Sequence, residues 1–183
     1  MPEYKILSKN IYSKGNFSII PIRYEDRLKI MNWRNEQMYH LRQSKRLSES
    51  DQEHYFETVV QKLYDQSKPN QILFSYLNDD TCIGYGGLVH INWIDRNAEV
   101  SFIMDTLFEK DFFDLHWSNF LSMLEEVAFK DLKLHKIYAY AFDLRPHLYD
   151  TLKNNDFFLD AELNEHCFFN DRYIDVVIYS KIK

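Results

Sequence analysis

The period of the hydrophobic pattern changes at Gln71, and this change limits the fold of the chain more than any other feature. Before it, a strand-like run at Phe17–Arg23 precedes two segments with apolar residues at helical spacing, Tyr24–His40 and the stretch that Ser48 and Asp51 begin. After it come three short apolar runs separated by turn residues, which predict an antiparallel meander of strands. These runs are ILFSYL, CIGYGGLVHINW and AEVSFIM.

Helices and strands alternate in the rest of the chain. Apolar residues recur at helical spacing in FDLHWSNFLSMLEEVA, which predicts a helix with Asp111 and Asp114 as candidate caps. A strand follows in KIYAYAF, a short helix begins near Pro146, and two strand-like runs, 157–169 and 172–182, close the sequence. The resulting order, β-α-α-β-β-β-α-β-α-β-β, requires a sheet covered by helices and therefore an α/β (α+β) fold.

The length and composition favour one domain. The chain has 183 residues, of which 45% are hydrophobic and 16% aromatic, and this is enough apolar surface for a sizeable core. No internal repeat, low-complexity tract or linker rich in Pro, Gly or Ser divides the sequence. We therefore predict a single domain over residues 1–183, in which residues 1–16 form an N-terminal extension.

Charge and cysteine content exclude several kinds of partner. The formal net charge is −6, so the chain lacks the excess of Lys and Arg that a nucleic-acid footprint requires. No apolar run approaches the ~20 residues of a membrane span. Cys82 and Cys167 stand in strand-like runs without the spacing of a metal site. These features predict a cytoplasmic protein with no nucleic acid, no membrane and no metal as partner.

Three phrases of the sequence add to the order of its elements. IGYGGLVHIN followed by RNAEVSFIMD, and later LKLHKIYAYAF, resemble the third, fourth and fifth strands of the GCN5-related N-acetyltransferase (GNAT) superfamily, and the match runs from about Phe17 to the C-terminus. The resemblance implies a mixed, mostly antiparallel central sheet of about seven strands flanked by four helices, with the fourth and fifth strands splayed apart. It also implies acetyl-CoA or another acyl-CoA as cosubstrate, no metal, and a primary amine as acyl acceptor.

The same resemblance implies where the acyl donor binds. In this family the pantetheine arm lies between the splayed strands, which here implicates Phe102, Ile103 and Met104. The pyrophosphate normally meets a glycine-rich turn before the next helix, whereas this chain has TLFEKDFFD there, without glycine and with several acidic residues. Lys110 is the cationic candidate in that turn. Arg145 is a second candidate because it falls where many relatives have a cofactor-binding Asn.

Two residues are candidates for acid–base chemistry. Glu99 matches a position where many relatives keep a carboxylate that removes the ammonium proton, often through water; a salt bridge at the strand edge is the alternative interpretation. Tyr149 is the candidate proton donor for the departing thiolate. It lies one turn before the position of the family's tyrosine, which Leu152 occupies here, and a packing or surface role is the alternative.

The candidate acceptor site comprises Trp33, Arg34 and Tyr85. The phrase WRN resembles a segment of GNAT enzymes that acetylate nucleotide-linked amino sugars, so that Trp33 would stack on a sugar or base and Arg34 would meet a diphosphate. Tyr85 lies on a strand-like run that would face the same cavity. A core tryptophan and a solvated basic turn are the alternatives.

The sequence therefore predicts an N-acyltransferase that moves an acetyl or other acyl group from acyl-CoA to a small-molecule amine, with a nucleotide-linked amino sugar as one candidate acceptor. Two other interpretations stay open. The glycine-free turn also fits a non-catalytic GNAT-like module that senses a metabolite or binds a protein. A protein N-terminus or a lysine is a third kind of acceptor that the acidic charge balance allows. The sequence also leaves a homodimer open.

Overall fold

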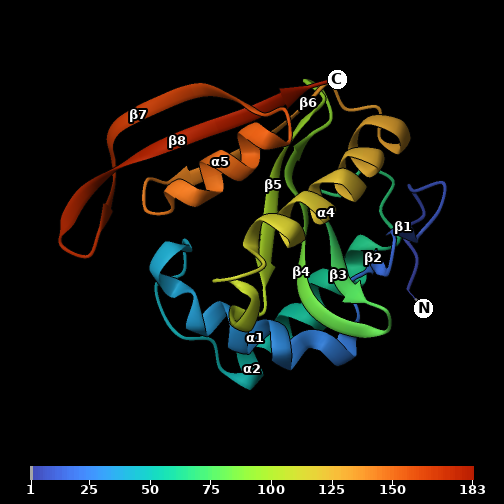
Figure 1. Ribbon diagram of the computed structural model, residues 1–183. Coiled ribbons are helices and arrows are strands. Elements are labelled where there is room, and N and C mark those ends of the chain that lie inside the picture. The colour runs from blue at the N-terminus through green and yellow to red at the C-terminus, as the bar shows by residue number, and fades with distance from the viewer. Residues whose placement is uncertain (1) are drawn as a thin grey trace.

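One mixed sheet of eight strands carries the fold (Figure 1). The structure, a computed structural model, describes residues 2–183. The strands lie in the order β1-β2-β3-β4-β5-β6-β8-β7, and all neighbours are antiparallel except β5 and β6, which confirms the predicted sheet. The strand bounds are Tyr12–Lys14 (β1), Phe17–Pro21 (β2), Ile72–Asn78 (β3), Thr81–Asn92 (β4), Asn97–Met104 (β5), Lys136–Phe142 (β6), Phe158–Phe169 (β7) and Arg172–Ile182 (β8).

Helices cover both faces of this sheet. A wider, π-type turn at Phe56–Val60 joins α2 to α3, so these two form one continuous helix, and a second such turn at Glu126–Asp131 extends α4. The helical rods are therefore α1, α2–α3, α4 and α5, as the sequence predicts. The helix bounds are Arg27–Glu36 (α1), Glu49–Tyr55 (α2), Gln61–Leu63 (α3), Phe113–Glu125 (α4) and Pro146–Asn154 (α5).

The two faces of the sheet carry separate cores because successive strand residues point to opposite sides. On one face α4 and α5 pack against a cluster that includes Phe102 and Phe120, whose stacked rings have centroids 4.1 Å apart. On the other face α1 and α2–α3 pack against a cluster that includes Trp33 and Ile103. The strand β5 therefore supplies side chains to both cores.

The N-terminal segment is part of the sheet and of the core. Tyr4 and Tyr12 are 1% and 0% exposed, and the Tyr4 hydroxyl both donates to the carbonyl of Leu73 and accepts from its N–H, at 2.9 Å each. Residues 12–14 pair with β2 as an additional strand. The segment predicted as an extension thus adds the strand that raises the sheet from the expected seven strands to eight.

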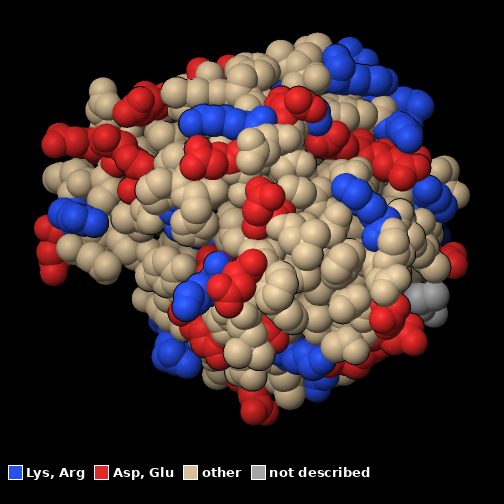
Figure 2. Space-filling view, in the orientation of Figure 1, with Lys and Arg blue, Asp and Glu red and all other residues tan. Residues whose placement is uncertain are grey.

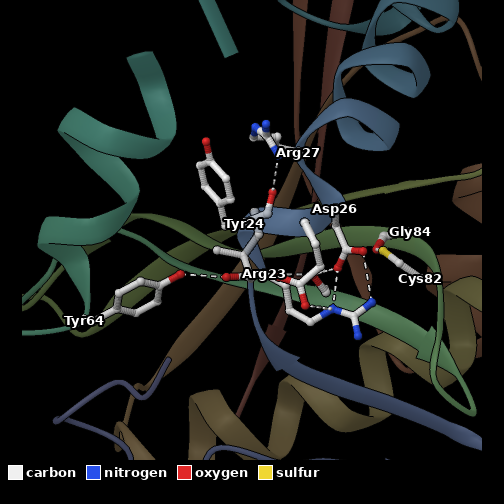
Figure 3. A network of polar contacts seen from close by, with 10 residues as sticks. Arg23, Tyr24, Asp26, Arg27, Tyr64, Cys82 and Gly84 are labelled. Atoms are coloured by element: carbon white, nitrogen blue, oxygen red, sulfur yellow. Dashed lines mark hydrogen bonds and ion pairs between the residues drawn. The ribbon is translucent and has the colours of Figure 1, made fainter. Parts of the chain in front are cut away.

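A buried polar network fixes the start of α1 against the sheet (Figure 3). The carboxylate of Asp26, 3% exposed, accepts from Arg23 Nε at 2.7 Å and Nη2 at 3.0 Å. It also accepts from the hydroxyl of Ser75 on β3 at 2.7 Å. Because a buried charge is tolerated only when it is paired and hydrogen-bonded, these contacts define where α1 can begin.

The helix starts agree with the sequence in two cases and differ in one. Ser48 and Asp51 form the predicted capping box at α2, and α5 begins at Pro146 as expected. Asp111 and Asp114 do not cap α4. The residue before this helix is Phe112, and no side chain bonds to the N–H groups of its first turn. The prediction of two acidic caps is therefore wrong.

Candidate active site

The strands β5 and β6 diverge soon after they meet. Their last paired residues are Glu99 and Tyr138, although the strands continue to Met104 and Phe142. On their outer edges β5 stays paired with β4 and β6 with β8. The facing backbone edges are therefore open beyond Glu99, which confirms the predicted splay.

A cleft of about 120 Å³ occupies the gap between these strands, and we call it the splay cleft. Phe102, Ile103 and Arg145 line it, as the sequence predicts for acyl-donor residues. Met104 does not: it is 1% exposed, and its carbonyl accepts a hydrogen bond from Gln37 Nε2 at 2.8 Å. Lys110 is exposed and lies outside the lining. The splay cleft thus brings together three of the five predicted donor residues.

Glu99 lies at the apex of the splay and lines the cleft. Its side chain is 8% exposed, and its two oxygens have different partners. Arg42 donates to Oε1, while Oε2 lies 2.9 Å from Nδ1 of His90. His90 reaches it from an irregularity in β4, where the register with β5 shifts and the backbone has φ of 51°. The carboxylate is therefore held in one orientation beside a side chain that is 64% exposed to solvent.

Arg145 closes the other side of the splay cleft, at the start of α5. Its side chain is 7% exposed, donates to Glu109, and places Nη1 3.2 Å from His40 Nδ1. Burial, followed by the Arg145 charge, lowers the pKa of His40 to about 3, so this imidazole is neutral and can accept from the guanidinium. Arg145 Nε and Glu109 Oε2 are buried without a partner. Arg145 therefore has one N–H group that no group within residues 2–183 satisfies, while Glu109 occupies another of its nitrogens.

The glycine-free turn before α4 forms without strain. Between Asp105 and Phe113 no residue has positive φ, so the path of this turn does not require glycine. The N–H groups of Leu107, Phe108 and Phe112 are bonded within the turn, and the N–H of His116 bonds back to it. The first-turn N–H groups of α4 have no intrahelical partner and no side-chain cap. Such groups, near the Arg145 guanidinium that lies over the Phe113 ring, fit a phosphate group.

A second cavity of about 390 Å³ lies between the sheet and helices α1 and α2, and we call it the helix-side cavity. Arg34 and Tyr85 meet there, since Arg34 Nη1 donates to the Tyr85 hydroxyl at 2.7 Å. Ser101 on β5 lines both this cavity and the splay cleft. Trp33 does not line it, because its side chain packs in the core and is 6% exposed. Trp33 therefore has no exposed ring face for the stacking on a ligand that the sequence predicts.

Comparison with known proteins identifies the fold and the family. A model of the acetyltransferase (GNAT) domain family matches residues 19–178. The chain belongs to the GNAT family. Within curated proteins, a search found no significant match.

Solved structures share the GNAT fold at low sequence identity. The crystal structure of spermidine N-acetyltransferase from Vibrio cholerae in complex with CoA and spermine has a TM-score of 0.80 and 22% identity, covering 92% of this chain and 96% of that one. A dodecameric structure of spermidine N-acetyltransferase from the same organism, in an intermediate state, has a TM-score of 0.75 and 21% identity, covering 92% and 95%. The likeness at this identity concerns the fold.

The tyrosines of this GNAT domain differ in their access to the splay cleft. Tyr149 lies outside the lining, where its hydroxyl donates to Asp143 Oδ1 at 2.9 Å and its ring stacks on Tyr179. Burial raises its pKa above the ordinary value. Tyr140 on β6 does line the cleft, and burial, followed by its contact with Cys167, raises its pKa to about 12. Tyr140 is therefore protonated at neutral pH and, unlike Tyr149, lies in the lining of the splay cleft.

The GNAT domain offers little support for other chemistry. Burial, followed by the charge of Asp26, raises the pKa of Cys82 to about 12, so this thiol is a poor nucleophile. Within residues 2–183, no three or more His, Cys, Asp or Glu side chains are grouped to hold a metal ion. In the same residues no helix has the length and apolarity to span a membrane. Figure 2 shows basic and acidic side chains interspersed, without a continuous basic field on the face drawn.

Sequence reasoning assigns no site role to His40 or Gln43, and it does not place Arg42 and His90 beside Glu99. His40 follows α1 and lies 105 residues before its partner Arg145. Gln43 and His90 are each 9 residues from their partners, Arg34 and Glu99, but belong to other elements of the fold.

Proposed function

We propose that this GNAT domain transfers an acyl group from acyl-CoA to the primary amine of a small molecule, with Glu99 as the general base. The observation that carries the proposal is the buried, oriented carboxylate of Glu99 at the apex of the open strand edges. Acyl-CoA, when bound, supplies the activated thioester. The amine nitrogen attacks the carbonyl carbon, the C–N bond forms, the C–S bond breaks, and the electron pair leaves with the sulfur.

The protein's own groups take up the proton and support the donor. Glu99 accepts the proton that the ammonium group must lose, and His90 provides the exposed route by which it reaches solvent. The open edge of β5 offers backbone groups to the pantetheine arm. Arg145 and the uncapped start of α4 are the groups that fit the pyrophosphate. Tyr140 is the candidate partner of the departing thiolate, in place of Tyr149.

Two acceptors belong in any test: spermidine, the substrate after which the structural neighbours are named, and the nucleotide-linked amino sugar that the WRN phrase predicts. The location in the cytoplasm and a homodimer stay predictions.

A thermal-shift titration followed by product analysis tests the proposal. Acetyl-CoA at 100 times its dissociation constant stabilises a binding protein by ~2.7 kcal/mol, and mass spectrometry then detects acetylated products from a panel of amines and peptides. No stabilisation by any acyl-CoA, with no product, would favour a non-catalytic module. Acetylation of peptides in preference to small amines would favour a protein acceptor.

A further inference from the structure

Arg34 is a partly buried cation without an acidic partner. Its Nη1 donates to the Tyr85 hydroxyl at 2.7 Å and its Nε to Gln43 Oε1 at 3.0 Å, both neutral acceptors. Among residues 2–183 no carboxylate oxygen lies within 4.0 Å of its guanidinium nitrogens, since none of the ion pairs includes it. The guanidinium therefore lines the helix-side cavity with its positive charge uncompensated.

The other arginines of the described chain show how unusual this is. Those that are not exposed each pair with a carboxylate: Arg23 with Asp26, Arg27 with Glu53, and Arg145 with Glu109. Arg46, Arg96 and Arg172 have no such pair but are exposed, so water solvates them. Because a buried charge costs free energy unless it is paired, the missing partner of Arg34 points to an anion that comes from outside the chain.

The helix-side cavity adjoins the position proposed for acyl transfer. Ser101 lines both the cavity and the splay cleft, and it lies on the same face of β5 as Glu99, two residues away. Tyr85 stands opposite Ile103, four residues along β5 from Glu99, which corresponds to roughly 13 Å along the strand. A molecule in the cavity can therefore present one end to Glu99 and the other to Arg34.

We infer that the acyl acceptor is a small amine that carries a carboxylate or phosphate group, and that Arg34 binds this anion in the helix-side cavity. The inference rests on the proposed function, whose acceptor class it narrows. A guanidinium donates through several N–H groups in one plane, a geometry that suits both anions. The volume of about 390 Å³ lies within the range of small-molecule sites.

A polyamine fits this cavity poorly. Its ammonium groups would meet the uncompensated charge of Arg34, and like charges brought together in a partly buried site repel. Asp51 is the one carboxylate in the lining, and it already accepts from the N–H and hydroxyl of Ser48, with Lys45 Nζ at 3.7 Å. The cavity therefore presents a positive charge where a polycationic acceptor requires negative ones.

Matched pairs of acceptors test the inference. A series of ω-amino acids that begins at β-alanine and lengthens by one methylene at a time is compared with the neutral primary amides of the same amines. Phosphoethanolamine distinguishes a phosphate from a carboxylate, and spermidine represents the polycations. For the wild type we expect kcat/KM for the best anionic amine to exceed that of its amide by at least about tenfold.

Variants of Arg34 test whether this residue causes the preference for anionic acceptors. Arg34→Gln should bring the ratio of anionic to neutral acceptor close to one, through a higher KM with kcat largely kept. Arg34→Lys keeps the charge and should retain part of the preference, which guards against a simple folding defect. Arg172→Gln, an exposed arginine at the β7–β8 turn, is the matched control and should keep the wild-type ratio. An unchanged ratio in Arg34→Gln, or spermidine as the best wild-type acceptor, would overturn the inference.

A binding measurement separates this inference from the proposed function. Thermal shifts with the same ω-amino acids and phosphoethanolamine, without acyl-CoA, are compared between wild type and Arg34→Gln. If no amine is acetylated, a shift that depends on Arg34 still supports the anion site while the proposed function fails. If neither the shift nor the kinetic preference depends on Arg34, the anion site fails whatever the outcome for acyl transfer.

Discussion

Arg42 and Glu99 form an ion pair at the apex of the splay cleft, between the link that follows α1 and the strand β5. The same guanidinium lies over the ring of Tyr140 on β6, 4.6 Å from its centroid. One side chain therefore contacts both of the diverging strands. Since Glu99 is also bonded to His90, its carboxylate is oriented by groups from two other elements before any substrate binds.

Replacing Glu99 by Gln tests its role as a base. Glu99→Gln keeps the shape of the side chain and an acceptor oxygen for Arg42 but removes the proton acceptor, so kcat at neutral pH should fall by ~10²-fold or more. The dissociation constant of acetyl-CoA should stay nearly unchanged, as measured by titration. Glu162→Gln, an exposed carboxylate on β7, is the control. Undiminished turnover in Glu99→Gln would leave Glu99 as a structural ion-pair partner only.

Because Glu109 pairs with Arg145, variants of these two residues should change the affinity for acetyl-CoA in opposite directions. Glu109 occupies a guanidinium that would otherwise face a phosphate, so Glu109→Gln should tighten acetyl-CoA binding by about tenfold. Arg145→Gln should weaken it by at least the same factor. Isothermal titration gives both constants, and Asp150→Asn, which changes the charge of an exposed residue on α5, is the control. Weaker binding to both variants would mean that Glu109 helps to position the donor.

Local patterns explain which parts of the fold the sequence predicts. The capping box of Ser48 and Asp51, the proline at the start of α5 and the alternating runs of the meander each depend on neighbouring residues. The strand β1 was missed because it has three residues, too few to show a period. The acidic caps of α4 failed because a carboxylate at a helix start is common whether or not it bonds to the backbone.

The candidate site is harder to predict because its contacts join different elements of the fold, some of them far apart in the sequence. Glu99 was identified by its place in a strand, but its partners Arg42 and His90 lie 57 and 9 residues away. The absence of glycine near residue 109 does not alter the path of the turn, which contains no residue with positive φ. Only the spatial arrangement reveals that Arg34 has no acidic partner.

The low pKa of His40 predicts a stability effect in acid. Its pKa is about 3 in the folded protein and near 6.5 when the chain is unfolded, so between these values the unfolded state binds a proton that the folded state does not. Stability is therefore lost as the pH falls below about 6.5. His40→Gln should remove this loss. Between neutral pH and about pH 4, its free energy of unfolding should therefore fall by ~2 kcal/mol less than that of the wild type. Urea unfolding across pH measures it, with the exposed His54→Gln as control. Identical pH slopes for wild type and His40→Gln would contradict the burial of a neutral imidazole.

The close approach of β4 and β5 makes Gly86 a position where a single methyl group should be strongly destabilising. A Cβ there would lie 2.1 Å from the carbonyl oxygen of Ser101 and 2.8 Å from Cα of Phe102, and backbone atoms cannot rotate away as a side chain can. Gly86→Ala should therefore lower the free energy of unfolding by at least ~3 kcal/mol. Gly15→Ala is the comparison, because its Cβ meets no atom within 4 Å and only the φ of 62° is unfavourable, at ~1 kcal/mol. Urea unfolding of both variants measures the difference.

Because Ser101 and Phe102 line the splay cleft, the shift of β5 should also weaken acetyl-CoA binding in Gly86→Ala. Equal costs for the two variants would mean that β4 and β5 can separate freely, and that the open edge of β5 is not held rigidly for the donor.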